Sequence, residues 1–352
     1  MVDWTKTMTQ TFEYYVVDPH TWKDVRPINT VISSSIKRDS EAETLGSLTL
    51  NVSESLGECY IRVYMITVQN GVREKHPMGT FLVQTPSYNF DGMVRTSTID
   101  AYTPLLELKE NRPPIGYSIL EGENIIQRAY RLVRENVRAP IEETKNETNL
   151  LYDFVANTDD TWITFIRDLI GNANYSFGID ELGRIMFMPI QSVASLQPKW
   201  TFDDSNSSIL YPSIDMKQDL YGIPNAVEVI YSNNKLFEYA KVVNDDPNSP
   251  TSTVNRGREI VHREVNPALG IPSKEHLEFY ANRLLKDLSC LEYRITYKHG
   301  YCPLQIGDCV RLNYERAGIK NVKAKIISQS IECVPGCPVT ETAVFTNRLW
   351  GD

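Results

Sequence analysis

Several features that would assign a protein to a class at once are missing from this chain of 352 residues. No stretch approaches the roughly 18 consecutive apolar residues of a membrane helix, so we expect no membrane span and no membrane anchoring. Residues 1–6 contain no apolar core, so we expect no cleaved signal peptide. Lys and Arg number 36 against 45 Asp and Glu, a net charge of −9, which argues against a protein that grips nucleic-acid phosphates.

Catalytic and cofactor motifs are missing as well. The sequence contains neither glycine-rich phosphate loop, G-x-x-x-x-G-K-[ST] or G-x-G-x-x-G, and no H-E-x-x-H zinc motif. The five histidines never pair at ligand spacing: His20, His76, His262, His276 and His299. We therefore expect no cofactor, no catalytic or cofactor-binding residue and no enzymatic activity.

Cysteine is sparse, with six in the chain: Cys59, Cys290, Cys302, Cys309, Cys333 and Cys337. Without a signal peptide we expect reduced thiols. Zinc sites favour tight pairs, whereas Cys302 and Cys309 enclose six residues and Cys333 and Cys337 enclose three. Buried structural thiols are the preferred interpretation. A metal site is the alternative, should the two pairs converge in a hairpin fold.

The text Gly307-Asp308-Cys309-Val310 superficially resembles the Asp-Cys of cell-wall cysteine peptidases. Such a nucleophile needs a helix N-terminus to lower its pKa and a histidine partner. Here Cys309 opens a predicted strand and no histidine follows it in the sequence. We predict a turn and a strand at this place.

Adjacent carboxylates occur at three places: Asp159/Asp160, Asp203/Asp204 and Asp245/Asp246. In extended chain such neighbours point to opposite faces, so they rarely form an acid/base pair. Helix capping explains the first pair and solvated loops the other two. Calcium is the alternative at the loop pairs, but no D-x-D-x-D-G pattern supports it.

What is present is a chain of ordinary composition, 41% hydrophobic and 23% charged, long enough for about two domains. The first third alternates apolar and polar residues at 47–52 and 60–65, which predicts antiparallel strands. Asn70-Gly71 predicts a hairpin with a return strand near 79–84, and Asp91-Gly92 a further hairpin before a strand at 93–100.

The middle of the chain changes character. Pro104, Pro113 and Pro114 indicate a linker, and helical periodicity follows at 121–138 and again after residues 158–160, ending at Gly171. A hairpin is predicted at 175–179 and 184–188. Arginines 128, 131, 134 and 138 lie along one side of the first helix, with Lys145 beyond, and form either a solvated face or, as the less favoured alternative, a docking face for an acidic partner.

The last third of the sequence again shows patterns typical of β-strands. Strands are predicted at 226–231, 237–243, 292–298, 308–314, 321–332 and 339–345, with a long polar loop at 244–257 and one helix that begins at Ser273 and runs to about 290. Two β units therefore flank an α/β segment. They share an architecture without a residue-level repeat.

The order of several blocks resembles the baseplate hub proteins of phage tails. Residues 79–83 (GTFLV) and 98–108 (TIDAYTPLLEL) are similar to the first domain of that family. The blocks at 160–170 (DTWITFIRDLI) and 178–185 (GIDELGRI) are similar to its middle segment, and those at 303–314 (PLQIGDCVRLNY) and 324–331 (AKIISQSI) to its last barrel.

The resemblance implies a mainly β (α+β) fold in which two tail-tube-like antiparallel barrels, 1–110 and 204–352, flank a small α/β insert at 111–203. It further implies a homotrimer whose six barrels form a ring of pseudo-six-fold symmetry, with a helix such as 273–290 packed on the outside of a barrel. The ring would join a hexameric tail tube or distal tail protein above to a spike or tip protein below, with the tape measure protein as a further partner.

Such a hub is a virion component made in the host cytoplasm, and it acts as an adaptor and a gate. Three copies would carry three times −9, or −27 formal charges, and acidic residues facing the lumen would keep passing DNA from sticking. Another tail structural component, either a distal tail protein or a host-binding module, is the first alternative. A cell-wall hydrolase is the second.

Overall fold

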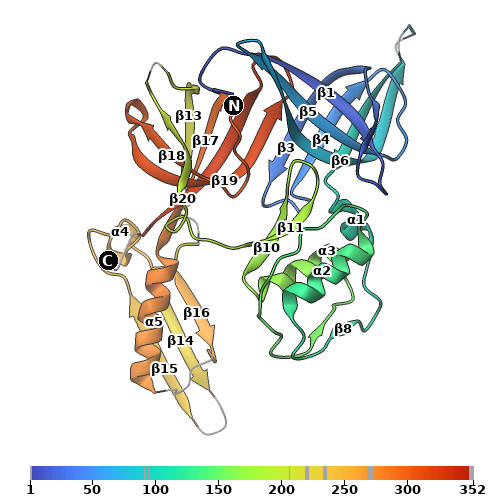
Figure 1. Ribbon diagram of the computed structural model, residues 1–352. Helices are drawn as coiled ribbons and strands as arrows, with labels where there is room; N and C mark the ends of the chain where they lie inside the picture. The colour runs from blue at the N-terminus through green and yellow to red at the C-terminus, as the bar shows by residue number, and fades with distance from the viewer. Residues whose placement is uncertain are drawn as a thin grey trace. The chain divides into compact units, whose positions relative to one another are not determined.

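The computed structural model describes residues 2–90, 92–93, 95–205, 207–218, 222–232, 236–267 and 273–348. It is mainly β, as predicted, with antiparallel sheet predominating (Figure 1). The chain divides into two compact units, one of Met1–Ile214 with Tyr297–Ala343 and the other of Asp215–Thr296 with Val344–Asp352. Among the described residues, no helix is long and apolar enough to cross a membrane.

The first barrel consists of seven strands. They are β1 (Thr9–Val17), β2 (Asp24–Pro27), β3 (Val31–Asp39), β4 (Gly46–Val52), β5 (Tyr60–Gln69), β6 (Val72–Phe90) and β7 (Arg95–Tyr102). The predicted alternation at 47–52 appears in the burial of β4, whereas the strand predicted at 60–65 is buried on both faces. Asn70 and Gly71 both have positive φ, as the predicted β5–β6 turn requires. The second predicted hairpin joins β6 to β7, although Asp91 of its turn lies outside the described residues.

The α/β insert follows the first barrel. It contains α1 (Leu106–Glu110), β8 (Ser118–Ile119), α2 (Ile125–Asn136), β9 (Phe154–Val155), α3 (Trp162–Gly171), β10 (Tyr175–Ile179) and β11 (Ile185–Pro189). The prediction of a proline-punctuated linker is wrong in one respect, because part of this segment forms α1. Leu105, Leu106 and Leu108 are buried there, and their burial orders a stretch that the prolines only delimit.

The second barrel uses strands from the last part of the chain: β12 (Pro198–Asp203), β13 (Leu210–Gln218), β17 (Cys290–Gly300), β18 (Cys309–Tyr314), β19 (Ile319–Glu332) and β20 (Pro338–Arg348), with the short 3-10 turn η1 (Glu315–Ala317). It is not separate from the first barrel. Of the described strands, thirteen form one continuous sheet, in which β19 of the second barrel pairs with β3 of the first.

The strand order of the first barrel recurs in the second. Across the sheet the first barrel has the order β3-β4-β7-β6-β5-β1, and the second has β13-β17-β20-β19-β18-β12. The members follow the same order along the chain, so β3 corresponds to β13, β6 to β19 and β7 to β20. The last pair differs in direction, since β1 is antiparallel to β5 and β12 is parallel to β18. The repeat is therefore one of topology.

The second compact unit is inserted between β13 and β17. It holds the sheet β15-β14-β16 and the helices α4 and α5, with bounds β14 (Ala226–Ser232), β15 (Phe237–Val243), α4 (Thr253–Arg256), β16 (Val261–Val265) and α5 (Lys274–Leu288). The expectation that this last helix packs on a barrel is wrong. Its apolar stripe of Leu277, Ala281 and Leu285 packs on Val227 and Val229 of the small sheet instead.

The long polar loop predicted at 244–257 is built around buried polar groups. Asn244 is fully buried and donates from Nδ2 to Ser249 Oγ at 2.9 Å. Asn225, also fully buried, donates from Nδ2 to the carbonyls of Thr251 and Arg258 at 3.1 and 3.0 Å. These hydrogen bonds satisfy the loop backbone internally, so the loop is an ordered element of the second unit.

Candidate functional site

The two barrels meet along one antiparallel ladder, which we call the junction. Residues Ser328 to Glu332 of β19 pair with Asp39 to Ser35 of β3, and Ile331 lies opposite Ile36. Both isoleucines are almost completely buried, at 1% and 0% exposure. On this face of the ladder the apolar pair Ile331–Ile36 is followed by the polar pair Gln329–Arg38.

The apolar core of the first barrel extends across the junction. Its buried cluster contains Tyr14, Leu50 and Ile99 from the first barrel together with residues from the second. The second barrel contributes Tyr301, Ile331, Cys333, Cys337 and Val339. The tip of the β19–β20 hairpin is thus part of the core of the neighbouring barrel, which fixes the two barrels against each other.

Arg38 places a charged group at the junction. It extends from β3, and its guanidinium donates to the Met78 carbonyl at 2.8 Å, to Gln329 Oε1 at 3.0 Å and to the Leu304 carbonyl at 3.3 Å. Met78 belongs to β6, whereas Gln329 and Leu304 belong to the second barrel. One side chain therefore bonds both barrels, and its planar fork suits this arrangement.

The network continues into the second barrel through Glu341. Gln329 donates from Nε2 to Glu341 Oε1 at 2.6 Å, and the Tyr297 hydroxyl donates to Oε2 at 2.7 Å. His299 Nε2 lies 3.3 Å from the same carboxylate, and both side chains have no exposure. Burial, and after it the Glu341 carboxylate, raises the pKa of Tyr297. The hydroxyl therefore remains a donor.

Sequence reasoning missed Arg38, Gln329 and Glu341. A signal was present for Glu341, because the strand places Val339, Glu341 and Ala343 in one alternating phase and all three are buried. A carboxylate in the apolar phase of a strand needs buried partners, and Tyr297 and Gln329 supply them. The partners themselves come from strands far away in sequence, so no local pattern could name them.

The cysteine cluster considered above behaves as four buried structural thiols. Cys302, Cys309, Cys333 and Cys337 are buried, and burial raises the pKa of each, that of Cys333 to about 11. No group of three or more potential metal ligands occurs in the part of the chain that the structure describes. The Cys309 thiol donates to the Val310 carbonyl at 3.7 Å, and burial raises its pKa, whereas an activated nucleophile has a lowered one.

One cysteine does approach a histidine. Cys302 Sγ lies 3.9 Å from His299 Nδ1, but that nitrogen already lies 2.6 Å from the Gly300 carbonyl, to which it donates. Both side chains are shut off from solvent, and burial raises the thiol pKa rather than lowering it. No substrate could reach the pair, which packs against the rings of Phe202 and Tyr297.

One member of each carboxylate pair acts locally, whereas Asp204 pairs with Arg316 at 3.4 Å. Asp160 accepts hydrogen bonds from the Asn157 amide at 2.8 Å and the Thr164 hydroxyl at 3.3 Å, while Thr161 is the N-cap of α3 and forms a capping box with Thr164. Asp160 therefore supports the capping of α3, but the N-cap residue itself is Thr161. Asp203 stabilises a turn through Ser205, and Asp246 does the same through Asn248.

The four arginines predicted on one side of a helix divide into two groups, and Arg138 lies beyond α2, which ends at Asn136. Arg128 donates to the Tyr117 hydroxyl at 2.7 Å, and Arg138 binds Glu107 and Glu58. Arg131 and Arg134 are exposed on the same helix. Two of the four guanidinium groups are therefore held by the protein itself, and the docking face for an acidic partner stays a prediction that rests on the other two.

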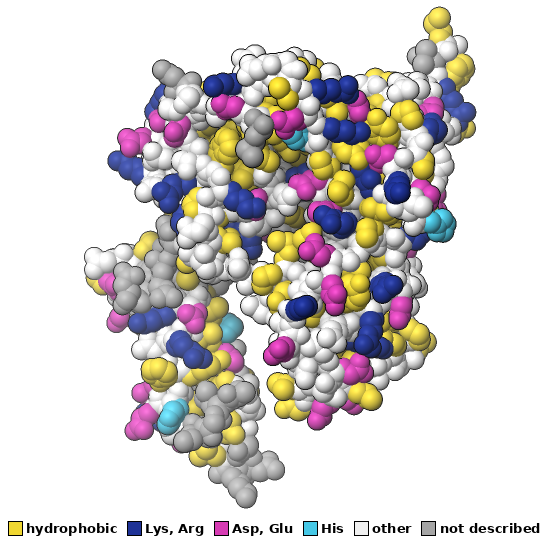
Figure 2. All heavy atoms as spheres, in the orientation of Figure 1, with side chains coloured by type: hydrophobic (Ala, Val, Ile, Leu, Met, Phe, Trp, Pro, Cys, Tyr) yellow, Lys and Arg dark blue, Asp and Glu magenta, His cyan; other side chains and the backbone are white. Residues whose placement is uncertain are grey.

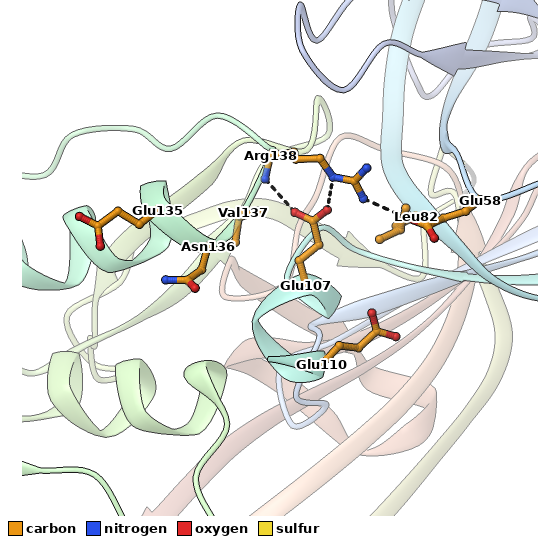
Figure 3. Close-up of a pocket in the computed structure, with 8 residues that line it drawn as sticks. All are labelled: Glu58, Leu82, Glu107, Glu110, Glu135, Asn136, Val137 and Arg138. Atoms are coloured by element: carbon orange, nitrogen blue, oxygen red, sulfur yellow. Dashed lines mark hydrogen bonds and ion pairs between the residues drawn. The ribbon is translucent and has the colours of Figure 1, made fainter. Parts of the chain in front are cut away.

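An open acidic pocket of about 380 Å³ lies beside Arg138 (Figure 3). Its lining residues come from α1, from the end of α2 and from the first barrel: Glu58, Leu82, Glu107, Glu110, Glu135, Asn136, Val137 and Arg138. The Arg138 backbone amide donates to Glu107 at 2.7 Å. Its guanidinium also pairs with Glu58 of the first barrel at 3.2 Å, and Gln84 of β6 donates to Glu110 at 2.9 Å. These two contacts tie the insert to the first barrel.

Comparison with known proteins places the whole chain in one fold. No protein-family description matches the sequence, and no curated protein sequence matches it. A tail protein from Neisseria meningitidis has a TM-score of 0.65 at 12% identity, with 95% of this chain and 97% of that chain covered. The 43 kDa tail protein of prophage MuSo2 from Shewanella oneidensis has a TM-score of 0.62 at 11% identity, covering 95% and 98%. A prophage tail protein from Listeria monocytogenes has 0.50 at 12% identity, covering 96% and 95%. At these identities the likeness establishes the fold.

Proposed function

We propose that this protein is a structural baseplate hub of a phage-type tail, a trimeric ring that joins the tail tube to the central spike or tip. The observation that carries the proposal is the recurrence of one strand order in two barrels of a single chain, joined edge to edge at the junction. The likeness to tail proteins over nearly the full length of both chains supports it.

Two equivalent barrels per chain allow a three-fold assembly to imitate a six-fold one. Three copies supply six barrels, and a contact like the junction, repeated between chains, would close them into a ring. Such a ring matches a hexameric tube or distal tail protein on one side and a three-fold spike on the other. The tape measure protein would pass through its centre, and the assembly would be part of the virion.

The lumen of this ring would carry DNA without binding it. With −27 formal charges per trimer, acidic side chains facing inward would repel the phosphates of the passing genome. A trimer whose lumen surface is neutral or basic would contradict this part of the proposal. The chain itself would perform no wall digestion, a task that would fall to a partner.

Negative-stain microscopy of the purified full chain tests the proposal. We expect ring-shaped class averages with three-fold symmetry, a central hole of tube dimensions, and joining to a tube protein. Hexamers alone would favour a distal tail component, and compact monomers would contradict the hub. Zymography on peptidoglycan is expected to show no activity, since Cys309 is buried. Lysis that is lost in Cys309→Ala would favour a hydrolase.

A further inference from the structure

A short segment at the start of the chain, residues 2–6, lies where the two barrels meet, and we call it the clasp. The N-terminus is seen between the barrels at the top of Figure 1, and Figure 2 shows hydrophobic side chains at the surface there. The clasp contains one turn, in which the Lys6 amide donates to the Asp3 carbonyl at 3.1 Å, and no helix or strand. Its position is therefore set by contacts with the barrels.

Reciprocal hydrogen bonds attach the clasp to the first barrel. The Asp3 amide donates to Gln69 Oε1 at 2.9 Å, and Gln69 Nε2 donates back to the Asp3 carbonyl at 2.8 Å. Gln69 is the last residue of β5. The Asp3 carboxylate also holds the turn, because it accepts from the Thr5 amide at 3.1 Å and from the Thr5 hydroxyl at 2.6 Å. The clasp is thus a locally stabilised turn bound at the end of one strand.

Trp4 is the residue through which the clasp reaches both barrels. Its indole forms a T-shaped pair with the His76 imidazole of β6, with 5.2 Å between the ring centroids. A second T-shaped pair, at 5.1 Å, joins it to the Tyr301 ring of the second barrel. Trp4 is half-buried and packs against the core that extends across the junction. One side chain of the clasp therefore bridges the barrels, through aromatic contacts of a stabilising geometry.

His76 connects the clasp to buried polar groups of the first barrel. Its Nε2 lies 3.0 Å from the hydroxyl of Thr67, which is fully buried. Gln10 lies opposite Thr67 in the β1–β5 ladder, is itself buried, and has no hydrogen-bond partner for Oε1 among the described residues. A charge added at His76 would therefore enter a poorly hydrated place, where an ionised group is costly.

His76 is also the group in this contact whose charge changes near neutral pH. Burial lowers the pKa of His76 from its ordinary value of 6.5, and the Glu74 carboxylate on the same strand opposes that shift to a smaller extent. The other charges near the clasp act elsewhere, since Lys6 pairs with Asp3 at 3.3 Å and the Arg38 guanidinium acts on the tyrosine that Trp4 contacts. The closed contact thus favours the neutral imidazole.

We propose that residues 2–6 are a pH-sensitive clasp, which holds the two barrels together near neutral pH and opens when His76 takes up a proton. The imidazolium moves toward water, because the site between Trp4 and Thr67 hydrates it poorly. This movement removes one of the two rings against which Trp4 packs, so the clasp no longer bridges the barrels. The proposal concerns contacts within one chain and does not depend on the hub function.

The direction of the pH dependence follows from burial of the neutral ring. With a lowered pKa, His76 binds fewer protons in the closed form than in the open one. The stabilisation of the closed form is therefore fully present above about pH 6.5 and is lost as the pH falls through the lowered pKa. Acid opens the clasp, and a return to neutral pH closes it.

Fluorine NMR of the full-length protein labelled with 5-fluorotryptophan tests the opening. The chain has five tryptophans, and Trp4→Phe identifies the signal of Trp4. Between about pH 7.5 and about pH 5 that signal should move toward the position of a solvent-exposed fluorotryptophan, across the range in which a histidine titrates. A Trp4 signal that stays in place over this range would overturn the proposal.

Substitution of the histidine identifies the trigger. Glutamine takes up no proton in this range and can still bond to Thr67, so in His76→Gln the Trp4 signal should lose its response to pH. The matched control is His20→Gln, at an exposed histidine of the turn between β1 and β2, which should keep the wild-type response. A response that survives in His76→Gln would reject His76 as the trigger.

A second substitution leaves the histidine in place. Because the Glu74 carboxylate raises the pKa of His76, Glu74→Gln should shift the midpoint of the Trp4 response to lower pH. A midpoint that is unchanged or higher would contradict the proposed titration.

Hydrogen exchange tests whether the clasp holds the barrels together. At neutral pH, Trp4→Ala should raise amide exchange in the segment around Tyr301 by about tenfold, as acid does in the wild type, and acid should then add little. Thr7→Ala, at an exposed position just beyond the clasp, is the control and should leave exchange unchanged. Wild-type exchange rates in Trp4→Ala would overturn the bridging role. Because each readout is within one chain, such a failure would leave the hub proposal standing.

Discussion

The two barrels share one strand order but differ in what covers their edges and in what fills their interiors. β3 of the first barrel is covered by β19, whereas its equivalent β13 pairs with β17 alone among the described strands. β7 of the first barrel buries Ile99, whereas the equivalent strand β20 buries the charged residue Glu341. The comparison teaches that a strand order can be repeated while the chemistry of equivalent strands is reassigned.

The difference in core chemistry gives the largest expected effect. Glu341→Ala should cost about 4 kcal/mol of the free energy of unfolding, because it leaves the Tyr297 hydroxyl and one N–H of the Gln329 amide buried without an acceptor. Urea denaturation measures it, and Glu341→Gln, which keeps an acceptor, is the milder control. If Glu341→Ala unfolds at the wild-type midpoint, the buried network does not stabilise the second barrel.

The difference in edge coverage gives the next effect. Ile36→Ala should cost about 3 kcal/mol, since Ile36 is fully buried in the junction. Ile214→Ala, at a half-buried position of the equivalent strand β13, should cost less than about 1 kcal/mol in dilute protein. Equal costs for the two substitutions under those conditions would mean that β13 is already covered within one chain.

Alkaline pH should act unevenly on the two barrels. Burial raises the pKa of Cys333 from 9.0 to about 11, so the folded state keeps a proton that the unfolded chain releases between these values. Stability is therefore fully present below pH 9 and falls as the pH rises toward 11, by up to about 2.7 kcal/mol from this thiol.

Three further buried thiols with raised pKa values belong to the second barrel, against one half-buried thiol, Cys59, in the first. Hydrogen exchange followed from pH 8 to pH 10.5 should show β18–β20 losing protection first, after correction for the intrinsic rate. The Cys333→Ala variant should show a smaller pH dependence of its urea midpoint. A pH dependence identical to that of the wild type would reject this thiol as the cause.

The smallest effect should be shared by both barrels. Gly71 ends the β5–β6 turn with φ of 79°, and Gly318 ends the equivalent β18–β19 turn with φ of 74°. In each case an added Cβ meets open space, so only the left-handed backbone opposes it. Gly71→Ala and Gly318→Ala should each cost about 1 kcal/mol in thermal or urea unfolding. A marked difference between them would show that the turns are not equivalent.

Local patterns in the sequence predicted most individual elements. The alternation at 60–65 became β5, the periodicity at 121–138 became α2, and Ser273 caps α5 as predicted. Each of these rests on interactions between residues close in sequence, which composition and spacing record. The segment that forms α1 is the exception. Pro104 and Pro113 mark its two ends, but they do not indicate whether the leucines between them are buried in a core.

Long-range pairing could not be read in the same way. Nothing local in β19 or β3 indicates that they pair across nearly 300 residues, since both simply alternate. The same holds for α5. Its apolar stripe could pack on any apolar surface of suitable width, and in the structure it packs on Val227 and Val229. The hydrogen-bond network of Arg38 and Glu341 depends on those strand pairings. It could therefore not be predicted before the pairings were known. The domain limits at 110 and 203 stay a prediction.

The position of the second compact unit has a consequence for how such a chain can diversify. In the first barrel, β3 and β4 are joined by a short turn at residues 40–45, whereas the equivalent strands β13 and β17 are separated by the whole of β14, β15, α4, β16 and α5. The core of that unit is its own, built from Val227, Leu277 and neighbouring residues. An insertion at a hairpin turn can be lengthened, exchanged or shortened by recombination while the barrel strands on either side keep their register, so new surface can be acquired at this point without redesigning the barrel.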